Sequence, residues 1–189
     1  ELKGVSRIYA YDGFYRTEVE LAILNNRNLF LSQGINTEEN KNKYIENINY
    51  AVSSALSAIK TNPENYQNYV SLGRAHELSI VIDKEAGYAK AKSAYEQAIK
   101  FYPENPYLYV MLARLEASAG TREAVRTQLT EALKKKYNFA DALYLMSQLE
   151  ASESKMEDAL AYAIEAVKNA PNDPLTYIQA GLLFYGKGD

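Results

Sequence analysis

The sequence predicts an all-α protein built from repeated helical hairpins. Apolar residues recur at intervals of three and four, as in YLYVMLARLEA at 107–117 and DALAYAIEAVKNA at 158–170, and this spacing is typical of helices with one buried face. No segment alternates apolar and polar residues for long enough to predict a strand. Short stretches with proline or glycine separate the helices, which favours antiparallel hairpins joined by tight turns.

Several unrelated landmarks repeat with one period. LEAS begins at 115 and again at 149, an interval of 34 residues, and Pro103, Tyr137 and Pro171 are separated by the same interval. A period shared by independent landmarks predicts an array of structural repeats.

Prolines mark the ends of the predicted helices. Pro106 and Pro174 suit a first helical turn, where the missing N–H is not needed, and Pro63, Pro103 and Pro171 follow helix C-termini. The expected helices cover about residues 14–32, 43–61, 65–81, 86–101, 106–119, 122–136, 140–153, 156–169 and 174–185. We expect a polar loop at 34–42, and the remnant of a preceding helix at 1–13.

The 34-residue helix–turn–helix period resembles that of the tetratricopeptide repeat (TPR) family. The unit from Pro106 fits the family pattern at Tyr109, Leu112, Ala113, Gly120, Val125, Leu129 and Ala132. The units on either side fit at Tyr69, Leu72, Gly73, His76, Ala91, Tyr95, Ala98 and Pro103, and at Leu143, Met146, Ser147, Ala159, Ala163, Ala166 and Pro171. The resemblance implies a TPR-type α-solenoid, a right-handed superhelix of antiparallel helix hairpins.

The resemblance implies a single array over 1–189 with five parts. These are a divergent N-terminal hairpin at 14–65, a repeat with an insertion at 66–105, repeats at 106–139 and 140–173, and a truncated half-repeat at 174–189. The insertion, around 79–90, adds six residues to the family spacing, and we expect it to lengthen either the turn or both helices. Because the chain starts without Met and ends inside a unit, we expect it to be a piece of a longer protein.

Composition and motifs argue against several classes of function. The net charge of −3 is spread along the chain, whereas nucleic-acid binding needs a clustered basic surface. There are no cysteines and one histidine, His76, which occupies a packing position of the repeat, and no metal, nucleotide or catalytic motif is present. Glu116 and Glu150 are 34 residues apart, so repeat geometry places them on successive units and not in one cleft. We expect no cofactor, no metal and no catalysis.

The family resemblance implies a peptide-binding groove on the first helices of the repeats. Its side chains would be Val70, Arg74, Tyr107, Val110, Arg114, Tyr144, Gln148 and Ile178. The same repeat positions add Gln67, Glu77, Ala117, Asp141, Ala151, Leu175, Leu182 and Tyr185. Arg74 and Arg114 occupy the same repeat position and would bind a carboxylate from one wall of the groove, unless each pairs with a local acid such as Glu77. The residues differ from the family's clamp for chaperone tails, so that partner is disfavoured.

The last predicted helix is apolar almost all round. Leu175, Ile178, Leu182 and Tyr185 form a candidate self-association surface, because terminal repeats normally need a polar outer face. The sequence therefore predicts a non-catalytic scaffold that binds a protein or peptide. Two alternatives stay open: a soluble accessory domain of a bacterial membrane-bound glycan ligase or transferase, and a homo-oligomerisation module. No segment of the chain has the length and apolarity of a membrane span, and no targeting segment is visible, so the compartment is left open.

Overall fold

A computed structural model describes residues 2–119 and 121–187, with side chains at 11–118 and 121–186. The described residues form helices and turns without a strand. The helices are α1 (Leu2–Ser32), α2 (Glu38–Thr61), α3 (Tyr66–Ser79), α4 (Lys84–Phe101), α5 (Pro106–Ala119), α6 (Arg122–Lys135), α7 (Ala140–Ser152), α8 (Met156–Asn169) and α9 (Pro174–Lys187). The prediction of an all-α fold is confirmed, and α5 and α8 have the predicted bounds.

The helices belong to two compact units that meet in the sequence between Pro103 and Glu104. We call them unit 1, which contains α1 to α4, and unit 2, which contains α5 to α9. Within each unit, consecutive helices pack as antiparallel hairpins: α1 with α2, α3 with α4, α5 with α6, and α7 with α8. The expectation that both units continue one array stays a prediction.

Unit 1 is held together by small residues and a buried polar cluster. Val19 and Ala22 of α1 pack against small side chains of α2 and α3, among them Ala51, Ala55 and Ala75. The small side chains allow close approach of the helices, which is what adjacent hairpins need.

The buried polar cluster ties α1 to α3. The Oδ2 atom of Asp12, a residue with no exposed surface, accepts hydrogen bonds from the Nδ2 atoms of Asn65 and Asn68 at 2.8 and 3.2 Å. Arg16 also pairs with this carboxylate at 3.0 Å. Burial alone would raise the pKa of Asp12, but the hydrogen bonds and the Arg16 charge lower it.

The structure corrects two predictions about the N-terminal hairpin. Residues 2–13 are the start of α1 and not the remnant of a separate helix, because α1 continues without a break from Leu2 to Ser32. The predicted loop at 34–42 is shorter, since α2 begins at Glu38. The Oγ1 atom of Thr37 accepts a hydrogen bond from the Asn40 amide at 3.2 Å, and acidic residues fill the first turn, so polar residues begin the helix.

The structure also accounts for the six-residue insertion. Helices α3 and α5 both have 14 residues, but α4 has 18 and α6 has 14. One extra turn therefore begins α4, and four residues separate α3 from α4, whereas two separate α5 from α6. A Cβ atom at Gly87 would lie 2.7 Å from the Ile80 backbone nitrogen, so glycine permits the extra turn to pack on the end of α3.

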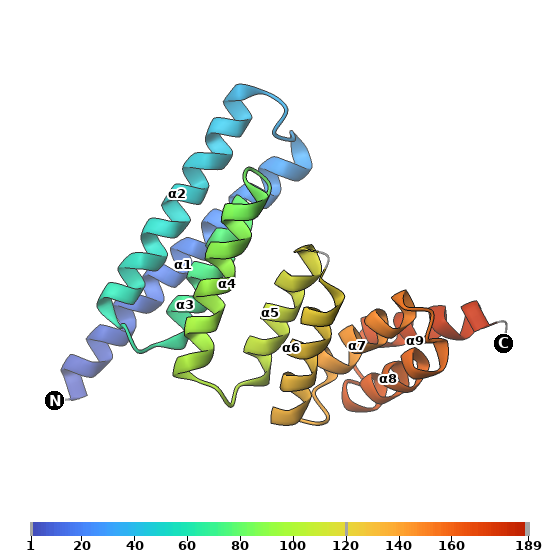
Figure 1. Ribbon diagram of the computed structural model, residues 1–189. Coiled ribbons are helices and arrows are strands. Elements are labelled where there is room, and N and C mark those ends of the chain that lie inside the picture. The colour runs from blue at the N-terminus through green and yellow to red at the C-terminus, as the bar shows by residue number, and fades with distance from the viewer. Residues whose placement is uncertain (1, 120, 188–189) are drawn as a thin grey trace. The chain divides into compact units, whose positions relative to one another are not determined.

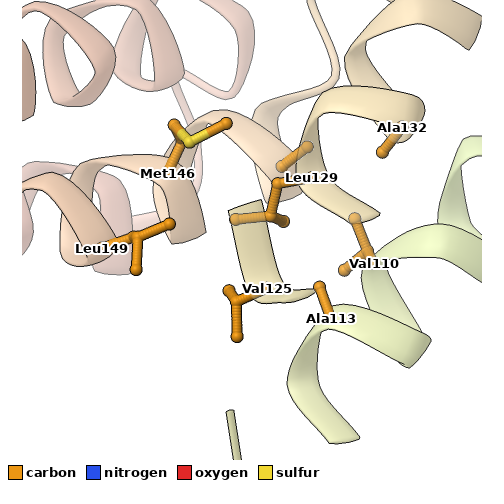
Figure 2. Packing of buried hydrophobic residues seen from close by; sticks show 8 residues of the cluster. Val110, Ala113, Val125, Leu129, Ala132, Met146 and Leu149 are labelled. Carbon is orange, nitrogen blue, oxygen red and sulfur yellow. The ribbon is translucent and has the colours of Figure 1, made fainter. Parts of the chain in front are cut away.

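Unit 2 has a core of larger side chains. Val110 and Ala113 of α5 pack with Val125, Leu129 and Ala132 of α6 and with Met146 and Leu149 of α7 (Figure 2). Helix α9 packs on α8 through a second cluster that contains Ala159, Ala163, Ala180 and Leu183. The two hairpins of unit 2 thus share one core, and α9 packs on the second of them.

Candidate functional site

A pocket of about 450 Å³ lies on unit 2 between α5, α6 and α7. Arg114, Ala117 and Gln148, three of the residues expected in a groove, line it together. Its apolar wall includes Val125, Leu145 and Leu149, and Thr121, Arg122 and Ser152 complete the lining. The pocket combines an apolar wall with polar and cationic groups, as expected of a surface that holds a side chain and fixes its orientation.

The pocket carries two uncompensated positive charges. Among the described residues, neither Arg114 nor Arg122 makes an ion pair or a side-chain hydrogen bond. Arg122 begins α6, at the positive end of the helix dipole. The Thr121 hydroxyl does not cap that helix and instead donates to the buried Glu116 carboxylate at 2.9 Å. An anionic group is therefore the complementary ligand for this pocket.

Unit 1 has a comparable hollow between α1 and α3. Its volume is about 410 Å³, and Gln67, Val70 and Arg74 line it, as the groove prediction implies, with Arg16 and Glu20 opposite. Arg74 pairs with Glu20 of α1. This acid differs from Glu77, which the sequence suggested as an example of a local partner. The Glu77 carboxylate accepts a hydrogen bond from the Tyr95 hydroxyl at 2.7 Å.

The remaining groove residues are placed differently. Val110 was expected in the groove, but it is fully buried in the core of unit 2, because α6 and α7 cover that side of α5 (Figure 2). Tyr107 is 41% exposed and does not line the pocket. The hydroxyl oxygen of Tyr144, a half-buried residue, accepts a hydrogen bond from the Gln148 amide at 2.8 Å. The expectation that Arg74 and Arg114 share one wall stays a prediction, since they belong to different units.

Sequence reasoning missed Arg122, Leu145 and Ser152. The resemblance assigned the groove to the first helices alone, whereas Arg122 belongs to a second helix. The visible signal was a basic residue at the start of a helix, where acidic residues are favoured.

The apolar face of α9 is exposed, as the sequence indicates. Leu175, Ile178, Leu182 and Tyr185 are 55, 56, 63 and 84% exposed. Ile178 was expected to serve both the groove and self-association, and it lies on this face. Whether a second copy covers these residues stays a prediction.

His76 lies half-buried in unit 1 beside Val52 and Lys90. Burial, and secondly the Lys90 charge, lower its pKa. The folded state thus disfavours the protonated imidazole, so stability should be highest above the unfolded pKa of about 6.5 and should fall as pH drops through that value. Urea unfolding at several pH values between about 7.5 and 5.5 measures this effect.

The matched variant is His76→Phe, because the chain has one histidine and carboxylates titrate at lower pH. We expect the variant to lose the decline in stability over this pH range. An unchanged decline would assign it to another group.

The described part of the chain contains no group of three or more residues suited to hold a metal ion. None of its helices combines the length and apolarity that crossing a bilayer requires.

Successive helical hairpins with exposed hollows on their first helices define a TPR-type α-solenoid fold. Comparisons with solved structures agree. A TPR protein of Thermus thermophilus superposes with a TM-score of 0.65 at 16% identity, covering 97% of this chain and 94% of that one. MamA superposes with a TM-score of 0.58 at 18% identity, covering 78% of each chain. YrrB, described as a TPR protein with an unusual peptide-binding site, superposes with a TM-score of 0.51 at 20% identity, covering 80% of this chain and 81% of that one. The predicted TPR-type fold is confirmed.

Comparisons of the amino-acid sequence identify fewer similar proteins than the comparisons with solved structures. No family model matches the chain. A stretch of 88 residues is 32% identical to cellulose synthase operon protein C of Pseudomonas fluorescens, which is 47% of this chain and 7% of that protein. The chain therefore corresponds to a small part of this curated relative.

Proposed function

We propose that this chain is a non-catalytic scaffold that binds a protein or peptide segment through the first-helix surface of its hairpins. The observation that carries the proposal is the unit 2 pocket, where Arg114 and Arg122 lie beside an apolar wall and make no ion pair with any described residue. A segment with a carboxylate next to an apolar side chain complements both features.

The fold supports this proposal by analogy. YrrB is a TPR protein with a peptide-binding site, and the Cut9–Hcn1 structure, with a TM-score of 0.61 at 14% identity, is a complex between proteins. Since one fold serves many partners, the analogy supports binding and does not name the ligand.

The test uses labelled peptides that end in an apolar residue, each with either a free C-terminal carboxylate or an amide. We expect the carboxylate forms to bind more tightly, and Arg114→Glu with Arg122→Glu, the two cationic residues of the pocket, to abolish that preference while helicity measured by circular dichroism is unchanged. The control pair Lys60→Glu with Lys134→Glu makes the same charge change at exposed positions away from the hollows. Equal binding by the arginine variant and the unmodified protein would contradict the proposal.

A second candidate rests on the match to cellulose synthase operon protein C. In this case the chain is an accessory segment of a larger bacterial protein concerned with a polysaccharide. The flanking coding sequence tests it, and an upstream membrane-spanning or glycan-enzyme domain is the expected result.

A further inference from the structure

Helix α1 has a second apolar face that the core of unit 1 does not use. Its buried residues, such as Val19 and Ala22, point toward α2 and α3. On the opposite side, Phe14, Leu21, Leu24 and Leu31 are 58, 54, 50 and 71% exposed. Four large apolar side chains in one row on a single surface helix are more than isolated exposure would give.

The spacing of this row indicates the shape of its partner. The four residues are separated by seven, three and seven positions, and Thr17 and Asn28 complete the same row. This is the spacing of the a and d positions of a heptad repeat, which packs against another helix lying alongside. The partner of the row is therefore an α-helix.

The row is complementary to itself when two copies run antiparallel. With a twofold axis between Leu21 and Leu24, Leu21 faces Leu24 of the partner subunit. In the same register Phe14 faces Leu31 of the partner subunit, and the polar Thr17 faces Asn28 of the partner subunit. Every apolar residue meets an apolar one, and the polar pair can hydrogen-bond, as a twofold interface requires.

The flanking charges favour the antiparallel direction. Glu20 and Arg27 occupy the equivalent position of successive heptads beside the row. Antiparallel pairing brings Glu20 next to Arg27 of the partner subunit, twice by symmetry. Parallel pairing would instead bring these charges next to Asn25 and Ser32 of the partner subunit, which are uncharged. Arg27 makes no ion pair among the described residues, and Glu20, though paired with Arg74, is 47% exposed.

We propose that α1 is a homodimerisation helix that pairs antiparallel with α1 of a second copy. This row is separate from the unit 2 pocket that carries the proposed peptide site, since Arg114, Arg122 and Gln148 all belong to unit 2. Thr17 and Glu20 also line the hollow of unit 1. A contact made by one helix from each copy lies at the low end of the ~1,200–2,000 Å² buried by stable complexes. The dimer is therefore concentration-dependent.

Sedimentation velocity across protein concentrations tests the surface. We expect a monomer–dimer equilibrium that Leu21→Ser with Leu24→Ser shifts to monomer at all concentrations tested. Both residues are at least half exposed, so the substitutions should leave helicity unchanged. The matched control is Leu182→Ser, which is 63% exposed on α9. A protein that is monomeric throughout, or a dimer lost with Leu182→Ser and kept by the α1 variant, overturns the proposal.

Cross-linking tests the direction, because the chain contains no cysteine of its own. We expect a mixture of Leu21→Cys and Leu24→Cys proteins to form more disulfide-linked dimer on oxidation than either protein alone. Cross-linking that is equally efficient within each single variant would indicate parallel helices and contradict the register.

Charge reversal tests the same register without cysteine. Arg27→Glu places like charges together twice, and we expect it to raise the dimer dissociation constant by about 2- to 30-fold. Mixing it with Glu20→Lys restores both pairs in a heterodimer, so mixed dimers should predominate. Random mixing would contradict the proposed pairing.

Discussion

We expect Leu129→Ala to lower the free energy of unfolding of unit 2 by about 2–5 kcal/mol, the range for a buried leucine cut to alanine. Leu129 has no exposed surface and lies at the centre of the cluster shared by α5, α6 and α7 (Figure 2). Helices from three directions surround it, so they cannot collapse easily into the space left by the side chain. Urea or guanidinium unfolding followed by circular dichroism measures the change.

A matched substitution shows whether burial causes the effect. Ile164 of α8 is 37% exposed, and solvent can occupy the space left by its truncation. Ile164→Ala should therefore lower the free energy of unfolding clearly less than Leu129→Ala does. Similar losses for the two variants would mean that the cluster does not stabilise unit 2.

We expect Arg126→Met to destabilise unit 2 by about 3–5 kcal/mol, because it leaves a buried carboxylate without its main partner. Arg126 of α6 pairs with Glu150 of α7, whose side chain is 5% exposed, and with Glu153 at 2.9 Å. Lys155 lies 3.6 Å from Glu150 but is itself half exposed, so it compensates weakly. The pair joins one hairpin to the next, and its loss should loosen α7 against α6.

The double variant Arg126→Met with Glu150→Leu is the control, since it removes the buried charge together with its partner. We expect it to recover most of the lost stability, because apolar residues of similar size can replace a buried ion pair at little cost. A double variant as unstable as Arg126→Met would assign the loss to packing of the arginine stem.

Acidification gives a second measurement of the same pair. The hydrogen bond from Arg126 holds the pKa of Glu150 below its usual value, despite burial. The pair therefore stabilises the fold above the unfolded pKa of about 4.3, and this contribution is lost as pH falls through the lower, folded pKa. The difference in stability between the unmodified protein and Arg126→Met should shrink as the pH is lowered.

The local features of the fold could be predicted from local sequence. The bounds of α5 were predicted from Pro106 and the 34-residue period, because proline and capping residues act on the backbone within one turn. The start of α1 was predicted wrongly. The absence of a proline indicates a continuous helix less strongly than the presence of a proline indicates a helix end. The sequence could not predict how the extra residues before Gly87 divide between a helical turn and a longer loop, because that division depends on the close approach of Gly87 to Ile80.

The candidate site was predicted in part. Arg114 and Gln148 line one pocket because repeat period and helix period together place equivalent residues side by side. Val110 was wrongly predicted to lie in the groove. A repeat position indicates the direction in which a side chain points, but it does not indicate which helices cover that side chain. Arg122 was missed because it reaches the pocket from a second helix, a long-range arrangement.

By itself, the sequence determined that this protein is an all-helical array of hairpins, because helix periodicity, breakers and the repeat are properties of residues close together in the chain. Only the tertiary structure decided which charges are compensated and which apolar faces are covered. Arg74 and Arg114 occupy the same repeat position, yet one pairs with Glu20 of α1 and the other stays free. The tertiary structure likewise decides which face of α1 is buried in the core and which face carries the exposed apolar row, because burial depends on contacts between distant parts of the chain.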